Sequence, residues 1–186
     1  IFTKENLLAS FTGSVDGLVA FKNGLPKFIN NLNEPVKIVK PFEFVPNQLN
    51  EGFKAPYDVQ YVALCGNFKK AGLPYTGALQ VFQNAVSTDY LWKNVRVLGG
   101  AYGCSCGFRG TGEAFFVSYR DPNLTKTLDV YHEVVKYIEE FNATEEEMIK
   151  YIIGAVGSFD FPLSPANKGV RSLGAYLNGK TVEDYK

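Results

Sequence analysis

Apolar and polar positions along the chain follow two different periods, which separate the predicted helices from the predicted strands. Residues 76–91, residues 128–141 and the segment after residue 144 place apolar side chains at helical spacing. Residues 101–108 alternate instead, with larger side chains on one face and small ones on the other, and residues 114–119 predict a strand paired with them across a tight turn. The pattern therefore predicts helices packed against an antiparallel hairpin.

The N-terminal part of the chain is less regular. Residues 7–12 predict a short strand, and residues 17–32 predict a helix that is interrupted near Pro26. Residues 33–56 contain Pro35, Pro41, Pro46 and Pro56 and predict a connection with extended pieces. The N-terminal part is therefore predicted to contain one strand and one helix.

The remaining segments complete an alternating order of strands and helices. Residues 57–65 predict a strand, and residues 166–177 predict a last helix. Thr144 and Glu147 have the spacing of a capping box at a helix start. We therefore expect an α+β fold, a two-layer sandwich whose mostly antiparallel sheet is covered on one face by helices.

Composition narrows the class of protein without identifying it. The 186 residues are 46% hydrophobic and 20% charged, an ordinary globular balance with room for a core. Nineteen basic and nineteen acidic residues cancel, so no nucleic-acid partner is expected. No run approaches the roughly 18 apolar residues that span a bilayer, so no membrane partner is expected either. An odd cysteine count suits a reducing compartment, and a start at Ile1 suggests a domain of a longer polypeptide.

The motif G-C-S-C-G at residues 103–107 has the spacing of a serine nucleophile elbow. That chemistry needs a strand, a sharp turn and a helix, with an acid and a histidine from later segments. Asp121 or Asp129 and the single histidine, His132, are of the right types. Because a hairpin and a second strand follow Ser105, we reject a serine hydrolase. Ser105 is interpreted as part of a face of small residues that leaves room for a helix or another backbone.

Phosphate and metal sites are not predicted in this chain. Its glycines match neither G-x-x-x-x-G-K-[ST] nor G-x-G-x-x-G. Cys65, Cys104 and Cys106 are interpreted as small buried hydrophobic residues, and His132 as a helix-surface residue, because no standard zinc spacing is present. Glu145, Glu146 and Glu147 suit the positive end of a helix dipole. We expect no metal ligand and no cofactor bound by this chain.

Arg96 and Tyr102 are the remaining candidates, six positions apart with Gly99 and Gly100 between them. An arginine offers five donors, and a tyrosine hydroxyl can donate to a developing oxyanion. The two glycines would let another backbone approach. Spacing alone favours a different interpretation, an internal arginine ion pair and a core tyrosine.

Residues 90–103, YLWKNVRVLGGAYG, closely resemble the signature in the C-terminal half of pitrilysin/insulinase-type zinc peptidases, most of all their presequence-protease branch. Residues 118–124, SYRDPNL, and residues 62–68, VALCGNF, also resemble that branch. The likeness extends from about residue 56 to residue 177 and is looser over residues 1–55.

The resemblance implies that residues 1–186 are one domain, the last of four related α+β domains that enclose a chamber. Residues 1–55 would be its looser strand–helix part and linker, and residues 56–178 its core. The family binds zinc in its first domain through an H-x-x-E-H motif, which this chain lacks. Zinc would therefore be bound by another domain of the full-length protein, and the isolated chain would be inactive.

In the family, an arginine and a tyrosine of the last domain hold the substrate backbone and the scissile carbonyl. By position in the motif these are Arg96 and Tyr102. We expect the C-terminal domain of a zinc metalloendopeptidase that degrades unfolded peptides in a closed chamber. Arg96, Gly99, Gly100 and Tyr102 would bind the substrate, and Tyr102 would also stabilise the oxyanion.

The expected partners are a peptide substrate and the N-terminal catalytic domains of the same polypeptide. The parent protein would be cytoplasmic if bacterial and would lie in an organelle matrix if eukaryotic. The alternative is a non-catalytic peptide-binding or structural domain of a family member that has lost catalysis.

Overall fold

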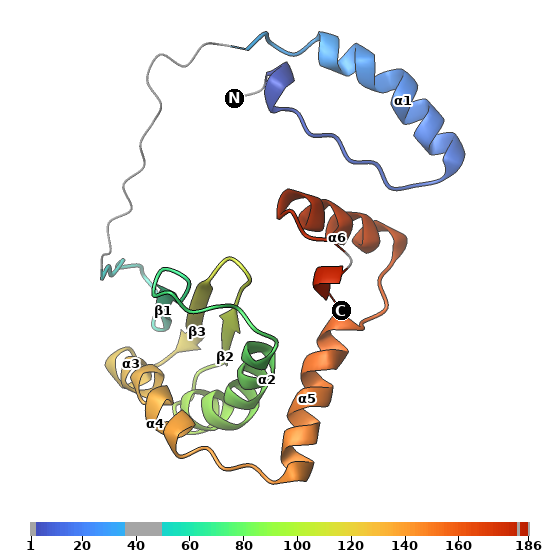
Figure 1. Ribbon diagram of the computed structural model, residues 1–186. Coiled ribbons are helices and arrows are strands. Elements are labelled where there is room, and N and C mark those ends of the chain that lie inside the picture. Colours follow the sequence, from blue (N-terminus) through green and yellow to red (C-terminus); the bar gives the residue numbers. More distant parts are fainter. Residues whose placement is uncertain (1–2, 36–49, 182, 186) are drawn as a thin grey trace. The chain divides into compact units, whose positions relative to one another are not determined.

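The computed structural model describes residues 3–35, 50–181 and 183–185, which fall into two compact units (Figure 1). The described residues of 1–50 and 162–186 form the first unit, and residues 51–161 form the second. The candidate site residues all belong to the second unit. The single domain expected over residues 1–186 stays a prediction.

The second unit is built on a three-stranded antiparallel sheet. Its strands are β1 (Gln60–Asn67), β2 (Gly103–Phe108) and β3 (Glu113–Asp121), in the order β1-β3-β2. β2 and β3 form the predicted hairpin, and β1 pairs with the other edge of β3. All three strands predicted in this region are confirmed, with shifts of a few residues at their ends.

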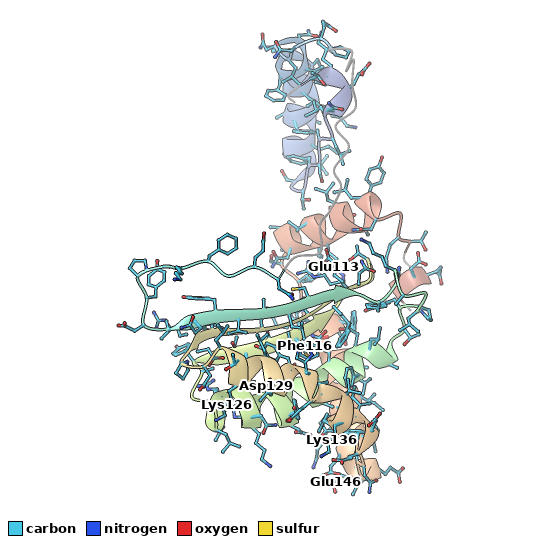
Figure 2. All side chains as sticks on the ribbon, turned by 90° about the vertical axis from the view of Figure 1, so that its left-hand side faces the viewer. Glu113, Phe116, Lys126, Asp129, Lys136 and Glu146 are labelled. Atoms are coloured by element: carbon cyan, nitrogen blue, oxygen red, sulfur yellow. The ribbon has the colours of Figure 1, made fainter. Side chains whose placement is uncertain are left out.

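Helices of this unit cover one face of the sheet, as expected for a two-layer α+β fold (Figure 2). Phe116 of β3 lies between the sheet and the helices, with its ring centroid 5.6 Å from that of Tyr131. The helices are α3 (Thr125–His132), α4 (Val134–Glu139), α5 (Glu145–Phe159) and α2 (Ala78–Ala85), which continues into a wider helix. The buried core residues are Val62, Val86, Leu91, Val95, Ala101, Cys106, Tyr131 and Val134.

The helix that continues α2 is a π-helix, η2, over Val86–Val97. The sequence predicts one helix over residues 76–91, so both its length and its type differ from the expectation. In a π-helix the hydrogen bonds run from residue i to i+5, as from the Leu98 amide to the Lys93 carbonyl at 2.9 Å. Because the turn is wider, the buried residues Val86, Leu91 and Val95, which are five and then four positions apart, lie on one face of the helix.

α5 begins as the capping box predicted. The Glu147 amide donates to the Thr144 hydroxyl at 3.3 Å, and the Thr144 amide donates to the Glu147 carboxylate at 2.8 Å. The pKa of Glu147 is lowered because the Thr144 amide and the Thr144 hydroxyl, the latter at 2.9 Å, both donate to its charged form. Its carboxylate therefore has a structural partner already.

The first unit contains α1 (Val15–Asn30), α6 (Pro165–Leu177) and two short 3₁₀ helices, η1 (Lys4–Asn6) and η3 (Glu183–Tyr185). α1 runs through Pro26, so the interruption predicted there is wrong. The strand predicted at residues 7–12 is also wrong, because no strand of the described chain pairs with this segment. Part of the predicted connection, residues 36–49, lies outside the described residues.

Candidate functional site

The turn from η2 into β2 carries Arg96 and Tyr102 and is closed by backbone hydrogen bonds. The Gly100 amide donates to the Arg96 carbonyl at 2.9 Å, and the Ala101 amide donates to the Val95 carbonyl at 3.1 Å. Gly100 has φ +81°, which favours glycine. A Cβ on Gly99 would collide with the Val95 carbonyl oxygen. The local backbone geometry at the end of the helix therefore favours glycine at both positions.

Arg96 lies on the surface of η2. Its guanidinium carbon is 4.1 Å from the centroid of the Trp92 ring, one helical turn earlier, in a cation–π contact. It forms no ion pair with any residue that the structure describes. The alternative interpretation, an internal ion pair of Arg96, is therefore wrong for the described part of the chain.

Tyr102 is 60% exposed, so the alternative of a core tyrosine is wrong. Its position is nevertheless held by three contacts. Its amide donates to the Arg120 carbonyl at 3.2 Å, and the Arg120 guanidinium carbon is 5.5 Å from its ring centroid. The ring of Tyr119 packs against it with the centroids 5.6 Å apart. Tyr102 is an anchored side chain that remains accessible.

A buried carboxylate fixes the chain next to this contact. Asp121 is fully buried and accepts hydrogen bonds from the Ser118 hydroxyl at 2.6 Å, the Thr127 hydroxyl at 2.8 Å and the Asn123 amide at 2.9 Å. The Asn123 side chain donates in turn to the Gly99 carbonyl at 2.6 Å. This network joins the end of β3, the start of α3 and the turn that carries Tyr102.

Sequence reasoning considered Asp121 only as a triad acid and missed this network. The signal available was a run rich in polar residues, 118–124, at the end of an apolar strand. A buried charge needs donors around it, and two of the donors to Asp121, the Asn123 amide and the Thr127 hydroxyl, come from the six residues that follow it. A polar segment of this kind can indicate a structural hydrogen-bond network as well as a catalytic site.

The serine-triad residues do not form a catalytic arrangement. Ser105 is exposed in the middle of β2, which is followed by a hairpin turn and β3 as predicted. The hydrogen bonds of Asp121 go to its own network, and His132 is exposed at the end of α3. The glycines beside Ser105 make room for aromatic rings of β3 rather than for a helix or a backbone. A Cβ on Gly103 would overlap the Tyr119 ring, and one on Gly107 would overlap the Phe115 ring.

The three cysteines are free and have different surroundings. Cys106 is buried 3.3 Å from the Ser87 hydroxyl, and burial raises the pKa of its thiol. Burial also raises the pKa of Cys104, against an opposing effect of the Arg96 charge. Cys65 is exposed, so its interpretation as a buried residue is wrong. Among the described residues, no group of three or more His, Cys, Asp or Glu could hold a metal ion.

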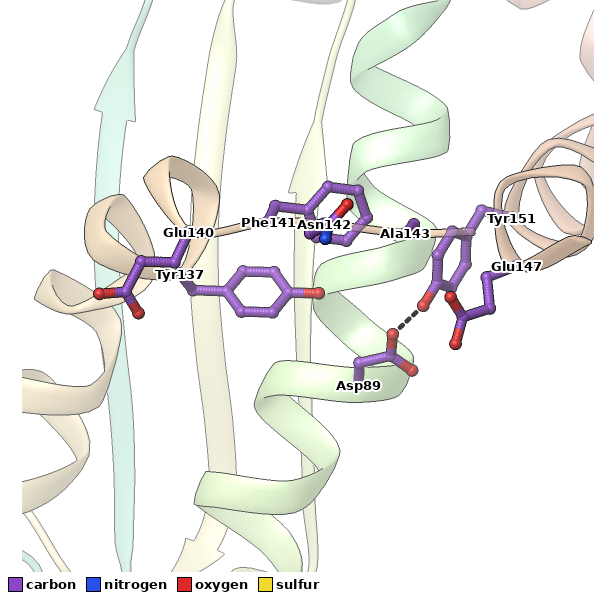
Figure 3. Close-up of a pocket in the computed structure, with 8 residues that line it drawn as sticks. All are labelled: Asp89, Tyr137, Glu140, Phe141, Asn142, Ala143, Glu147 and Tyr151. Carbon is purple, nitrogen blue, oxygen red and sulfur yellow. Dashed lines mark hydrogen bonds between the residues drawn. The ribbon is translucent and has the colours of Figure 1, made fainter. Parts of the chain in front are cut away.

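A hollow of about 320 Å³ lies where η2, the end of α4 and the start of α5 meet (Figure 3). The rings of Tyr137, Phe141 and Tyr151 line it, and Tyr151 donates to Asp89. Its other lining residues are Glu140, Asn142, Ala143 and Glu147. A hydrogen bond to Asp89, rather than burial, is the main cause of the raised pKa of Tyr151.

A second hollow, of about 300 Å³, is lined by apolar side chains of α2, α5 and the α4 region. Neither hollow includes Arg96 or Tyr102. Arg96 and Tyr102 therefore lie outside both hollows. Every helix in the described ranges is too short or too polar to cross a membrane.

Comparison with known proteins identifies the family of this chain. Residues 50–186 match the PreP C-terminal domain family. The chain is 41% identical to Protein HypA of Clostridium perfringens over 99% of its own length and 19% of that protein's. It is 39% identical to presequence protease 1, chloroplastic/mitochondrial, of Arabidopsis thaliana over 99% of its own length and 17% of that protein's.

A third relative is the mitochondrial presequence protease of Danio rerio, 30% identical over 79% of the chain and 14% of that protein. The chain thus spans less than a fifth of the length of these curated relatives. The matches cover β1 to α6, including the turn with Arg96 and Tyr102 and the Asp121 network. The chain therefore belongs to the PreP C-terminal domain family, a domain of peptidase-family proteins.

Proposed function

We propose that this domain presents Arg96 and Tyr102 to a peptide held by its parent peptidase, which degrades unfolded peptides in a closed chamber. The observation that carries the proposal is the state of Tyr102, which is 60% exposed yet held by Arg120 and Tyr119. A side chain whose ring is already packed but which remains accessible suits contact with a ligand, because less side-chain entropy remains to be lost. The relatives named presequence proteases support a peptide as that ligand.

The two side chains would act on different parts of the peptide. The Tyr102 hydroxyl would donate a hydrogen bond to the oxygen of the scissile carbonyl as negative charge develops there. The Arg96 guanidinium would bind main-chain carbonyls through its five donors. Contacts with the backbone would give little preference for particular side chains. Gly99 and Gly100 would leave room for the approaching peptide, a role additional to their part in closing the turn.

The zinc implied by the resemblance does not fit the described residues of this chain, which offer no donor set for it. We therefore place the metal in another domain of the parent protein and assign no step to it here. The N-terminal catalytic domains are the proposed partners of this domain. The parent would lie in the cytoplasm of a bacterium or in the organelle matrix of a eukaryote.

The substitution Tyr102→Phe in the full-length protein tests the proposal. Loss of one oxyanion donor costs on the order of 3 kcal/mol, so kcat should fall about 100-fold with KM little changed. Tyr57→Phe is the matched control, since Tyr57 is 67% exposed and precedes β1. An unchanged kcat for Tyr102→Phe would instead favour a non-catalytic peptide-binding or structural domain.

A further inference from the structure

Strand β3 carries one extra residue at the end that contacts Tyr102. Tyr61 of β1 pairs with Tyr119, but the preceding residue, Gln60, pairs with Asp121. Arg120 is left between them as the bulged residue. Within the described ranges it is the single non-glycine residue with positive φ, at +48°.

A left-handed conformation is unfavourable for a residue with a Cβ and persists where its surroundings impose it. Here the residues on both sides of Arg120 are fixed by their own contacts. Tyr119 covers Gly103 with its ring, and Asp121 turns inward to full burial among three hydrogen-bond donors. Arg120 must bridge these two fixed positions. Bulges of this kind occur beside functional sites, where they re-aim a side chain.

At the bulge, the carbonyl and the guanidinium of Arg120 both contact Tyr102. Its carbonyl accepts from the Tyr102 amide at 3.2 Å, and its guanidinium carbon lies 5.5 Å from the Tyr102 ring centroid. The side chain is exposed and forms no ion pair with the described part of the chain, so no carboxylate there competes with the ring for its charge. A planar guanidinium also stacks on an aromatic face in a way that a lysine ammonium does not.

We propose that Arg120 is a positioning residue, which seats the ring of Tyr102 for contact with substrate. This inference rests on the proposed function of Tyr102. Tyr119 packs against the same ring, and the turn before Tyr102 is held through Gly99 by Asn123. The guanidinium of Arg120 adds a contact that a rigid turn alone would not provide.

The kinetic test uses the full-length protein and the substitution Arg120→Gly. Glycine adopts positive φ readily, so this change keeps the bulge and removes the guanidinium. Loss of an exposed cation–π contact should lower kcat about two- to five-fold, with a smaller change in KM. Arg120→Lys should recover part of the loss. Arg109→Ala is the control, because the Arg109 guanidinium carbon also lies 5.5 Å from a ring centroid, that of Phe115.

A double-mutant cycle separates positioning from a direct role. If Arg120 acts through the Tyr102 hydroxyl, Arg120→Gly should cost nothing further in a Tyr102→Phe background. An equal loss of kcat in both backgrounds would overturn the proposal. So would a loss of the same size in Arg109→Ala.

A structural measurement decides the positioning role even if the proposed function fails. With 3-fluorotyrosine at position 102 of the full-length protein, Arg120→Gly should shift the fluorine resonance and Arg120→Lys should return it part of the way. Arg109→Ala should leave it in place. A resonance unmoved by Arg120→Gly overturns the proposal. Should Tyr102→Phe retain full kcat, the catalytic role of Tyr102 is lost, and a shifted resonance still supports Arg120 as the residue that seats its ring.

Discussion

The two ends of the β2–β3 hairpin are built from the same kinds of residue. At the open end the Arg120 guanidinium lies 5.5 Å from the Tyr102 ring, and at the turn end the Arg109 guanidinium lies 5.5 Å from the Phe115 ring. At each end a glycine of β2 lies under an aromatic ring from β3. Residue types and spacing alone would rate the two ends as equivalent.

The difference lies in how each arginine is held. Arg109 forms an exposed ion pair with Glu113 at 3.1 Å, next to a tight turn. Arg120 is a bulged residue with positive φ, followed directly by the buried Asp121. Exposed ion pairs contribute little to stability, whereas a strained residue beside a buried network is held in one conformation. Rigidity imposed by the core, and not the arginine–ring contact itself, distinguishes the candidate site.

The largest expected effect comes from removing the buried carboxylate with Asp121→Ala. The hydroxyls of Ser118 and Thr127 and the amide of Asn123 would lose their acceptor. Unsatisfied buried donors and a lost charged acceptor should lower the free energy of unfolding by on the order of 3 kcal/mol. Urea denaturation of the chain measures this change.

The corresponding substitution at the turn end is Glu113→Gln, which breaks the exposed ion pair with Arg109. It should change the free energy of unfolding by about 0.5 kcal/mol or less. If the two variants lose similar stability, the two ends of the hairpin are not held differently, and the comparison fails.

The next largest effect is expected from two glycine substitutions, which should have similar effects on stability but different effects on activity. In both Gly103→Ala and Gly107→Ala the added methyl would overlap a ring of β3, so each should cost about 1–3 kcal/mol of stability. The ring displaced by Gly103→Ala is that of Tyr119, which packs on Tyr102. Gly103→Ala should therefore also lower kcat of the full-length protein, and Gly107→Ala should not. Equal values of kcat would show that the packing of Tyr119 is irrelevant to Tyr102.

Much of this fold follows from the sequence, because its elements depend on local patterns. The alternation of residues 101–108 predicts β2, and the Thr144 capping box predicts the start of α5. Residues 7–12 have strand-like composition, but a strand also needs a partner, which local pattern does not supply. The π-helix over Val86–Val97 was missed because its buried positions fit neither regular period.

The candidate site was less predictable. Arg96 and Tyr102 were identified through a family resemblance, since their spacing alone favoured a core tyrosine. The role of Asp121 was missed because its donors come from the end of β3 and from α3, which only the fold brings together. Positive φ is usually signalled by glycine or asparagine, and at the bulge the residue is Arg120. What the sequence lacks is the tertiary restraint that makes an unusual local conformation necessary.

The smallest effect at neutral pH concerns Tyr131, which lies under the open end of the hairpin. Its hydroxyl is buried without a hydrogen-bond partner among the described residues, so Tyr131→Phe should be nearly neutral there. Burial raises the pKa of Tyr131 to about 12, against an opposing effect of the nearby Ser118 hydroxyl and with a smaller contribution from the charge of Asp121. The unfolded chain would ionise this phenol near its ordinary value of about 10.

Between about pH 10 and 12 the folded state therefore holds a proton that the unfolded state has lost, so stability should fall as the pH rises through this window. Tyr131→Phe should make that fall shallower, as measured by urea midpoints from pH 9 upward. An identical alkaline slope in Tyr131→Phe would mean that the hydroxyl reaches solvent. The core beneath the open end would then be less closed than the burial of Asp121 implies, and the main contrast with the turn end would weaken.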